Sequence, residues 1–404
     1  MNPIQSFRQN PALTLYIHFP WCVKKCPYCD FNSHEVSTNF NEEHYIDALL
    51  LDLEQDLGMI WGRPIQTIFM GGGTPSLFSA KAIDRLLSGI RARVQLQPNA
   101  EITLEANPGT TEASNFKGYR ESGINRLSLG VQSFNDDALI KLGRIHDAKQ
   151  AVDAFQQARD AGFERINLDL MHGLPGQTLK LAMQDLYKAT TLQPEHISWY
   201  QLTLEPNTLF YNKPPILPNE DLQFEIFQAG IEHLSSKQYQ RYEVSAFSQK
   251  GEASNHNMNY WSFGDYLGIG AGAHSKITHV PTMQILRRQK TRQPDTYLNP
   301  KKSFLASEKA IEISELPLEF MMNALRLCGG VEEQLFTINT GLPKQLLNDA
   351  INKAQAQELM LNWPDRIQPT AHGMQFLNDT LALFFSDNFP ALAKTNQISI
   401  TQLE

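Results

Sequence analysis

The chain of 404 residues has few cysteines, no excess of basic charge and no long apolar run. Four cysteines are too few for a disulfide framework; the fourth, Cys328, lies in an apolar helical pattern and is expected to be a small buried side chain. The net charge of -8 argues against a broad nucleic-acid or anionic-membrane surface. Residues 1–12 do not resemble a signal peptide. We therefore expect a cytoplasmic protein with no nucleic-acid partner and no membrane span.

Short β-branched or aromatic runs alternate with helix-length segments over the first part of the chain. The expected strands are residues 13–19, 65–70, 101–106, 125–131, 165–171 and 196–204. The expected helices between them are residues 42–57, 80–94, 148–161 and 178–192. This alternation favours parallel strands with crossover helices, and hence an α/β fold in the form of a partial (β/α)6 TIM-like barrel. In such barrels the chemistry gathers at the carboxyl ends of the strands.

The repeat stops after Phe247. The domains that we expect are a core at residues 1–250, a connecting region at 251–315 and a smaller C-terminal domain at 316–404. The C-terminal elements that we expect are helices at 318–328 and 346–357, a two-stranded wing around Trp363 and a last helix from Thr370. That order predicts a winged-helix-like α+β domain. Because it lacks a dense basic helix, we expect it to pack or dock a partner rather than bind DNA.

Three cysteines, Cys22, Cys26 and Cys29, follow the first expected strand within one short loop. An iron–sulfur cluster normally takes four thiolates, so three of them leave one iron open to a non-protein ligand. A zinc site is the alternative, but zinc would need a fourth ligand, for which His18 and His34 are the candidates. The spacing therefore favours a reactive cluster, and the open iron implies a second cofactor.

Glycines and polar residues follow the later strands. Residues 71–76, Gly-Gly-Gly-Thr-Pro-Ser, let the backbone approach a ligand, where free amides and carbonyls could hold an amino group. A phosphate loop is the competing interpretation, but the Gly-Lys-Ser/Thr ending is missing. Glu105 could accept hydrogen bonds from ribose hydroxyls, although helix capping is the simpler role. Gln132, Arg144 and Asp169 lie at or beyond strand ends, and Arg144 could clamp a carboxylate.

Together these segments resemble the radical S-adenosylmethionine (SAM) family, in its coproporphyrinogen-oxidase-like branch. The resemblance is nearly full length and is carried by residues 16–22, the cysteine loop, 71–76, 104–108, 130–134, 142–146 and 167–176. It implies a radical SAM barrel in which Cys22, Cys26 and Cys29 bind a [4Fe-4S] cluster whose open iron takes the amino and carboxylate groups of SAM. The residues that match SAM-contacting positions are Tyr16, Tyr28, Gly73, Thr74, Glu105, Gln132, Arg144 and Asp169.

Within this branch the chain resembles the haem chaperones more than the decarboxylases. The decarboxylase pattern has a longer N-terminal extension and a further cysteine two positions beyond the third ligand, where this chain has Phe31. Residues 256–261, His-Asn-Met-Asn-Tyr-Trp, match the HNxxYW motif of the chaperones, which implies that His256 is an axial haem ligand. A core histidine with packing aromatics is the alternative for an isolated motif.

The resemblance thus implies a chaperone that binds haem and delivers it to an apoprotein, such as one of the respiratory chain. The cluster and SAM would support binding or transfer, and no catalytic residue is assigned. A reductant protein and transient contact with membrane proteins are further expected partners. Oxygen-independent coproporphyrinogen III oxidation is the alternative, and radical modification of RNA has no supporting basic face. The basic residues Arg287, Arg288, Lys290 and Arg292 would suit haem propionates, but we expect a solvated loop there.

Overall fold

The computed structural model describes residues 6–7, 9–36, 40–109, 114–362, 364–389 and 392. Residues 1–5, residue 8 and Trp363 therefore lie outside the described residues, so the expectations for the N-terminal segment and for the wing fall partly outside them. The parallel strands are β1 (Leu13–Phe19), β4 (Ile65–Gly72), β5 (Leu96–Ala106), β6 (Arg126–Gln132), β7 (Arg165–His172) and β8 (His196–Gln201). They pair in chain order, every neighbouring pair parallel, which confirms the expected partial (β/α)6 barrel.

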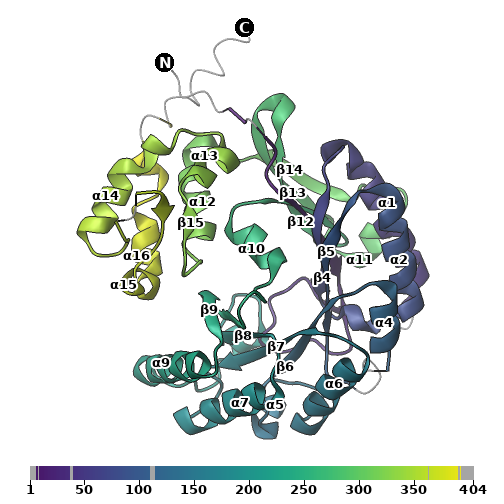
Figure 1. The fold of residues 1–404 in the computed structure, drawn as a ribbon. Helices are drawn as coiled ribbons and strands as arrows, with labels where there is room; N and C mark the ends of the chain where they lie inside the picture. Colours follow the sequence, from purple (N-terminus) through teal and green to yellow (C-terminus); the bar gives the residue numbers. More distant parts are fainter. Residues whose placement is uncertain are drawn as a thin grey trace.

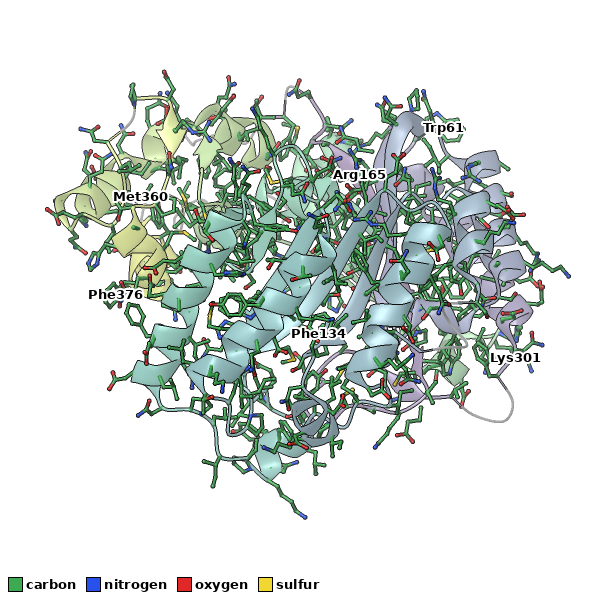
Figure 2. All side chains as sticks on the ribbon, turned by 60° about the horizontal axis from the view of Figure 1, so that its bottom comes forward. Trp61, Phe134, Arg165, Lys301, Met360 and Phe376 are labelled. Atoms are coloured by element: carbon green, nitrogen blue, oxygen red, sulfur yellow. The ribbon has the colours of Figure 1, made fainter. Side chains whose placement is uncertain are left out.

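Helices cover the outer face of this curved sheet (Figures 1 and 2). They are α1 (Glu42–Asp56), α2 (Ala80–Arg93), α4 (Phe116–Ser122), α6 (Ala148–Asp160), α7 (Leu179–Leu192) and α9 (Glu220–Ser236). Local sequence fixes where several begin, because Asn41, Ser79 and Thr178 each accept a hydrogen bond from a first-turn amide. Asp147 goes further and forms a capping box with Gln150 at the start of α6.

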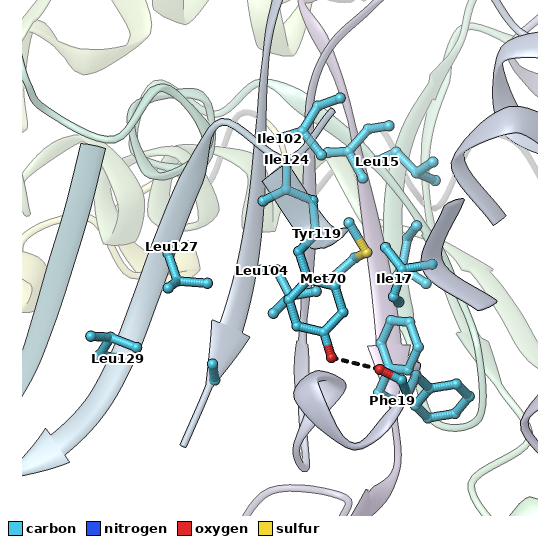
Figure 3. Packing of buried hydrophobic residues seen from close by; sticks show 14 of the residues in the cluster. Leu15, Ile17, Phe19, Met70, Ile102, Leu104, Tyr119, Ile124, Leu127 and Leu129 are labelled. Atoms are coloured by element: carbon cyan, nitrogen blue, oxygen red, sulfur yellow. Dashed lines mark hydrogen bonds between the residues drawn. The ribbon is translucent and has the colours of Figure 1, made fainter. Parts of the chain in front are cut away.

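The barrel core lies between the strands and these helices. Leu15, Ile17 and Phe19 project from β1 beside Met70 and Leu104 of the neighbouring strands (Figure 3), and all five are fully buried. Each such side chain stabilises the fold by about 1.5–3 kcal/mol. Because side chains alternate along a strand, the residues between them on β1 point to the inner face, where the barrel carries its polar groups.

The sheet extends beyond both ends of the parallel set. On one side β11 (Asp265–Ile269) runs parallel to β1, and the antiparallel strands β12 (His274–His279), β13 (Gln284–Lys290) and β14 (Leu305–Ala310) follow it. On the other side lie β10 (Ala246–Ser248) and β9 (Gln240–Glu243). The region that follows the repeat thus supplies four strands to a sheet of 12 in the described part of the chain. It also supplies α10 (Asn255–Trp261), which lies inside the curve of the sheet (Figure 1).

The basic run does not form the solvated loop that the sequence suggested. Arg287, Arg288 and Lys290 lie on β13, and the last two are buried. Both pair with Asp56: Arg288 Nη1 lies 2.7 Å and Lys290 Nζ 2.6 Å from its carboxylate oxygens. Buried cations need such partners, and these two are therefore committed to the fold. Arg292, beyond the end of the strand, stays exposed.

The C-terminal elements form a second, smaller core on the far side of α10 (Figure 1). They are α12 (Leu316–Ala324), β15 (Val331–Glu332), α13 (Gln334–Thr340), α14 (Asn348–Ala356), β16 (Arg366–Ile367), α15 (Ala371–Gln375) and α16 (Leu377–Ala382). Thr370 caps α15, as expected, and β16 pairs with β15. Cys328 lies past the end of α12 and is only partly buried, so the expectation of a buried cysteine inside a helix is wrong. No helix among the described residues is long and apolar enough to cross a membrane.

Candidate cofactor site

A cavity of about 350 Å³ lies at the carboxyl ends of the parallel strands. Ten of the predicted residues line it: Cys22, Cys26, Cys29, Tyr28, Gly73, Thr74, Glu105, Gln132, Arg144 and Asp169. Tyr16 lines an adjoining cavity instead, and His256 lines neither. The structure therefore gathers into one site residues that come from the ends of five different strands, as expected for a barrel of this type.

The cysteine loop presents its three thiols to this cavity. A turn between Cys26 and Cys29, closed by a backbone hydrogen bond of 3.1 Å, brings the second and third cysteines together. Their partners are weak: Cys22 Sγ lies 3.6 Å from the carbonyl of His34, and Cys29 Sγ 3.6 Å from the hydroxyl of Ser33. Burial raises the pKa of Cys22 to about 11 and also raises that of Cys29. Thiols in this environment ionise when a metal centre supplies positive charge, so the loop fits a cluster.

His18 is not available as the fourth ligand of a zinc site. Its Nδ1 lies 2.9 Å from the hydroxyl of Tyr16, and its Nε2 lies 2.8 Å from the carbonyl of Asn32. Both ring nitrogens therefore have partners already, and burial lowers the pKa of the ring to about 4. This engagement removes one of the two histidines on which the zinc alternative depends.

The glycine segment at the end of β4 is bound through its amides to the backbone just before Cys22. Gly73 N donates to Phe19 O at 2.6 Å, and Thr74 N donates to Trp21 O at 2.7 Å. A Cβ on Gly73 would lie 2.4 Å from the same Trp21 oxygen, so only glycine allows this approach. The expectation of free amides is therefore wrong for these two residues. A ligand amino group needs acceptors, and the carbonyl oxygens of the segment are the groups that can provide them.

Two partly buried carboxyl groups face the cavity from β5 and β7. Glu105 accepts a hydrogen bond of 3.2 Å from Gly72 N, and burial, with the charge of Asp169 as a lesser cause, raises its pKa to about 8. Asp169 accepts hydrogen bonds of 2.8 Å from Ser128 Oγ and from Asn167 Nδ2, and burial raises its pKa as well. Glu105 is thus protonated near neutral pH and can both donate to and accept from ligand hydroxyls.

Arg144 connects the cysteine loop to two strand ends. Its guanidinium donates to Asn107 Oδ1 at 2.6 Å, to Gly130 O at 2.8 Å and to Cys26 Sγ at 3.5 Å. None of these groups is a carboxylate, and no ion pair of Arg144 occurs among the described residues. Its positive charge is therefore available to an anionic ligand in the cavity.

Gln132 occupies the left-handed region at the end of β6, with φ of 69°. This conformation is uncommon outside glycine and is often found at functional sites. Its Oε1 accepts a hydrogen bond of 2.7 Å from the hydroxyl of Tyr200, which also lines the cavity. Sequence reasoning missed Tyr200, Ser128 and Asn107. Asn107 and Tyr200 lie at strand ends, which was the available signal, whereas Ser128 lies within β6; each residue type is ordinary at its position.

His256 lies at the second position of α10, against β4 and β5 and outside the lining of the cluster cavity. Its Nδ1 lies 2.6 Å from Thr67 Oγ1, and its backbone N donates to Glu101 Oε1 at 3.2 Å. The ring stacks on Phe69 and meets Tyr260 edge-on, with both pairs of centroids 5.0 Å apart. The residue is 2% exposed, and burial lowers its pKa to about 3. The structure therefore shows a neutral, enclosed imidazole apart from the cluster cavity.

Comparison with known proteins agrees with this geometry. The radical SAM superfamily matches residues 16–185, which include the cysteine loop and the strand ends through Asp169. The partial barrel and its three-cysteine rim thus define the class: a radical SAM protein. Two curated relatives called heme chaperone HemW span 93% of this chain and 99% of their own: that of Escherichia coli is 48% identical, that of Haemophilus influenzae 50%. The chain belongs to the HemW family within the radical SAM superfamily.

A solved structure shows the same fold. It is that of coproporphyrinogen III oxidase (HemN) from Escherichia coli, which is described as a radical SAM enzyme. The two superpose with a TM-score of 0.77 over 93% of this chain and 90% of that one, at 24% identity. The agreement over nearly the whole length confirms the α/β barrel with an additional C-terminal part.

Proposed function

We propose that this protein is a haem chaperone, which binds haem and delivers it to an apoprotein while a [4Fe-4S] cluster and SAM occupy its core. The observation that carries the proposal is the similarity of 48–50% over nearly the full length to relatives called heme chaperones. The cavity supports the cofactor part, because the same cavity is lined by three thiols, the guanidinium of Arg144 and two partly buried carboxyl groups.

Each cysteine of the loop would hold one iron, and the fourth iron would take the amino and carboxylate groups of SAM. When bound and reduced, this pair of cofactors supplies radical chemistry. Arg144, which has no carboxylate partner in the described part of the chain, would attract the SAM carboxylate, and protonated Glu105 would bind ribose hydroxyls. The other side chains and backbone groups proposed to contact SAM are Tyr16, Tyr28, Gly73, Thr74, Gln132 and Asp169.

The partners follow from the same proposal. The recipient would be a haem-free protein, such as one of the respiratory chain, which implies transient contact with membrane proteins. A small electron-donor protein would reduce the cluster. Free thiols and an exposed cluster require a reducing compartment, and the cytoplasm provides one.

Coproporphyrinogen oxidation remains the competing function. The likeness to the solved oxidase shows the fold alone, and Phe31 stands where the decarboxylase pattern has a further cysteine. Phe31 is 61% exposed and lines the cavity, so no thiol is available at that point to take part in chemistry.

One experiment separates the two functions. Anaerobically reconstituted protein would be titrated with haem and, in a parallel sample, given SAM, reductant and coproporphyrinogen III. A saturable shift of the Soret band at about one haem per chain, without protoporphyrinogen, is the expected result. Formation of protoporphyrinogen, or no saturable binding of haem, would contradict the proposal.

A further inference from the structure

A row of polar side chains runs from the cluster cavity into the interior of the barrel. It begins at Asp169 on β7, which lines both the cluster cavity and a smaller cavity of about 200 Å³. Asn167, two residues earlier on the same strand, and His196, the first residue of β8, line the smaller cavity but not the cluster cavity. Because alternate residues of a strand point to the same face, Asn167 and Asp169 both face the lumen.

The backbone of β8 determines how the amide of Asn167 is turned. Its Oδ1 lies 3.0 Å from the backbone N of Ser198, a group that can only donate a hydrogen bond. The Nδ2 group therefore points the other way, where it donates to Asp169 Oδ1 at 2.8 Å and to Ser128 Oγ at 2.7 Å. The carboxyl group of Asp169 is thus held by Asn167 from the side away from the cluster cavity.

The orientation of Asn167 in turn determines the tautomer of His196. Its Nδ1 lies 2.6 Å from Asn167 Oδ1, which only accepts, so Nδ1 carries a proton. Burial, with the charge of Arg126 as a lesser cause, lowers the pKa of the ring to about 3, so the ring holds a single proton at neutral pH. Nε2 is then an acceptor, and the hydroxyl of Tyr242, 2.9 Å away, donates to it.

The donors therefore point in one direction along the whole row, from Tyr242 through His196 and Asn167 to Asp169. Its far end is fixed by the C-terminal part of the chain, because the carbonyl of Tyr242 accepts a hydrogen bond of 3.0 Å from Cys328 N. His196 is only 2% exposed, so water does not compete for its two ring nitrogens. Each hydrogen bond in the row thus depends on the next one.

Packing alone is the competing role for a buried histidine, and His172 on β7 shows what that role looks like. It is also 2% exposed, and burial lowers its pKa to about 4. Its ring packs on Trp199, with centroids 4.4 Å apart, and its Nδ1 has no hydrogen-bond partner among the described residues. His196 differs because both of its ring nitrogens are engaged and one of them leads to Asp169.

We propose that His196 is a positioning residue for SAM binding: its Nδ1–H group holds the amide of Asn167, which holds the carboxyl group of Asp169 in the wall of the cluster cavity. The inference rests on the proposed function, in which Asp169 contacts SAM. It adds to that site a residue that does not line the cluster cavity and that reaches the ligand only through two others.

The test compares two substitutions of His196 in the anaerobically reconstituted protein. His196→Asn places an amide near the position of Nδ1 and can still donate to Asn167, whereas His196→Gln places it near the position of Nε2 and cannot. His172→Asn and His172→Gln are the matched controls, because that ring is equally buried but bonds to no part of the row. Equilibrium binding of SAM is measured for all four variants, with iron content and thermal unfolding as checks of the core.

We expect His196→Gln to bind SAM about 5–10-fold more weakly and His196→Asn to stay within about twofold of the parent. Both His172 variants should keep parental SAM affinity even where their melting temperature falls. A packing role predicts no such difference between the two His196 variants. Equal SAM affinity in both, or tighter binding by His196→Gln, would therefore overturn the inference.

The tautomer supplies a second measurement that does not depend on a variant's stability. ¹⁵N NMR of the unmodified protein, labelled at histidine, should show a neutral His196 ring with its proton on Nδ1. A proton on Nε2, or on both nitrogens, at neutral pH would contradict the direction of the row and the inference with it. Failure of the unmodified, reconstituted protein to bind SAM would instead contradict the cofactors of the proposed function, on which this inference rests.

Discussion

Arg144 places its Nη1 atom 3.5 Å from the sulfur of Cys26. The same guanidinium bonds to Asn107 after β5 and to Gly130 on β6. A single cation thus joins the cluster loop to two strand ends, at the corner of the cavity where the proposed cluster and SAM would meet. Because the Arg144 guanidinium lies at this corner, it can hydrogen-bond to the loop and the two strand ends and can also bind an anionic ligand in the cavity.

Replacing Arg144 should weaken SAM binding more than cluster binding. Arg144→Ala removes a charge-assisted contact worth roughly 1.5–3 kcal/mol, so SAM affinity should fall by about 10–100-fold while the iron content stays near the parental value. Equilibrium binding of SAM to the reconstituted protein measures the change. Arg120→Ala is the control, because the guanidinium of Arg120 donates to the backbone carbonyl of Gly162, away from the cavity. SAM affinity within about twofold of the parent would refute the assigned role.

The three loop cysteines and Cys328 should behave differently on reconstitution. Cys22→Ser, Cys26→Ser and Cys29→Ser should each hold far less than the roughly four irons per chain of a [4Fe-4S] cluster. Cys328→Ser should keep the full content, because that residue lies beyond α12 and does not line the cavity. Iron and sulfide analysis measures both. If Cys328→Ser lost the cluster and the three loop variants kept it, the assignment of Cys22, Cys26 and Cys29 as ligands would be wrong.

Glu105 should make the protein without cluster and SAM less stable at high pH. Its folded-state pKa, about 8, lies above the ordinary 4.5, so the stability gained by holding this proton is complete below pH 4.5 and is lost as pH rises through 8. Glu105→Gln should therefore flatten the fall in unfolding free energy between pH 6 and 8 by up to ~1.4 kcal/mol per pH unit. Urea unfolding at a series of pH values measures this slope of the unfolding free energy. Glu232→Gln, on the exposed face of α9, should keep the parental slope.

His256 should contribute to the loss of stability in acid. Its folded-state pKa is lowered to about 3 from 6.5, so the unfolded chain takes up a proton that the folded protein excludes between these values. Stability from this residue is thus present above pH 6.5 and is lost as pH falls toward 3. His256→Gln should reduce that slope by about 1.4 kcal/mol per pH unit, as measured by urea unfolding. His279→Gln is the control, and equal slopes in both variants would contradict the enclosed imidazole.

The sequence predicted the parallel strands and the residues at their carboxyl ends because the patterns that mark them are local in the chain. The strand β1 alternates the apolar residues Leu15, Ile17 and Phe19 with more polar ones, and its end is marked by the cysteine loop. Glu105 and Asp169 could be placed because barrel geometry brings all strand ends to one edge, whatever the loops between them do. The helix starts were equally local, since Ser79 and Asp147 cap the turns that follow them.

What the sequence could not show depends on partners far along the chain. His256 bonds to Thr67, 189 positions earlier, so its enclosure is invisible in the local motif. Lys290 pairs with Asp56 across 234 positions, and a basic run that looks solvated is buried for that reason. The adjoining cavity likewise brings distant segments together, since Tyr16 of β1 and Tyr266 of β11 both line it.

Transfer of haem to a recipient tests the central claim most directly. Protein carrying cluster, SAM and one equivalent of haem would be mixed anaerobically with a haem-free respiratory haemoprotein, and the Soret spectrum of each partner followed in time. The account predicts that haem passes to the recipient faster than free haem or haem on serum albumin does, and that no porphyrinogen is consumed. Retention of haem by the protein, together with conversion of coproporphyrinogen III to protoporphyrinogen, would contradict it.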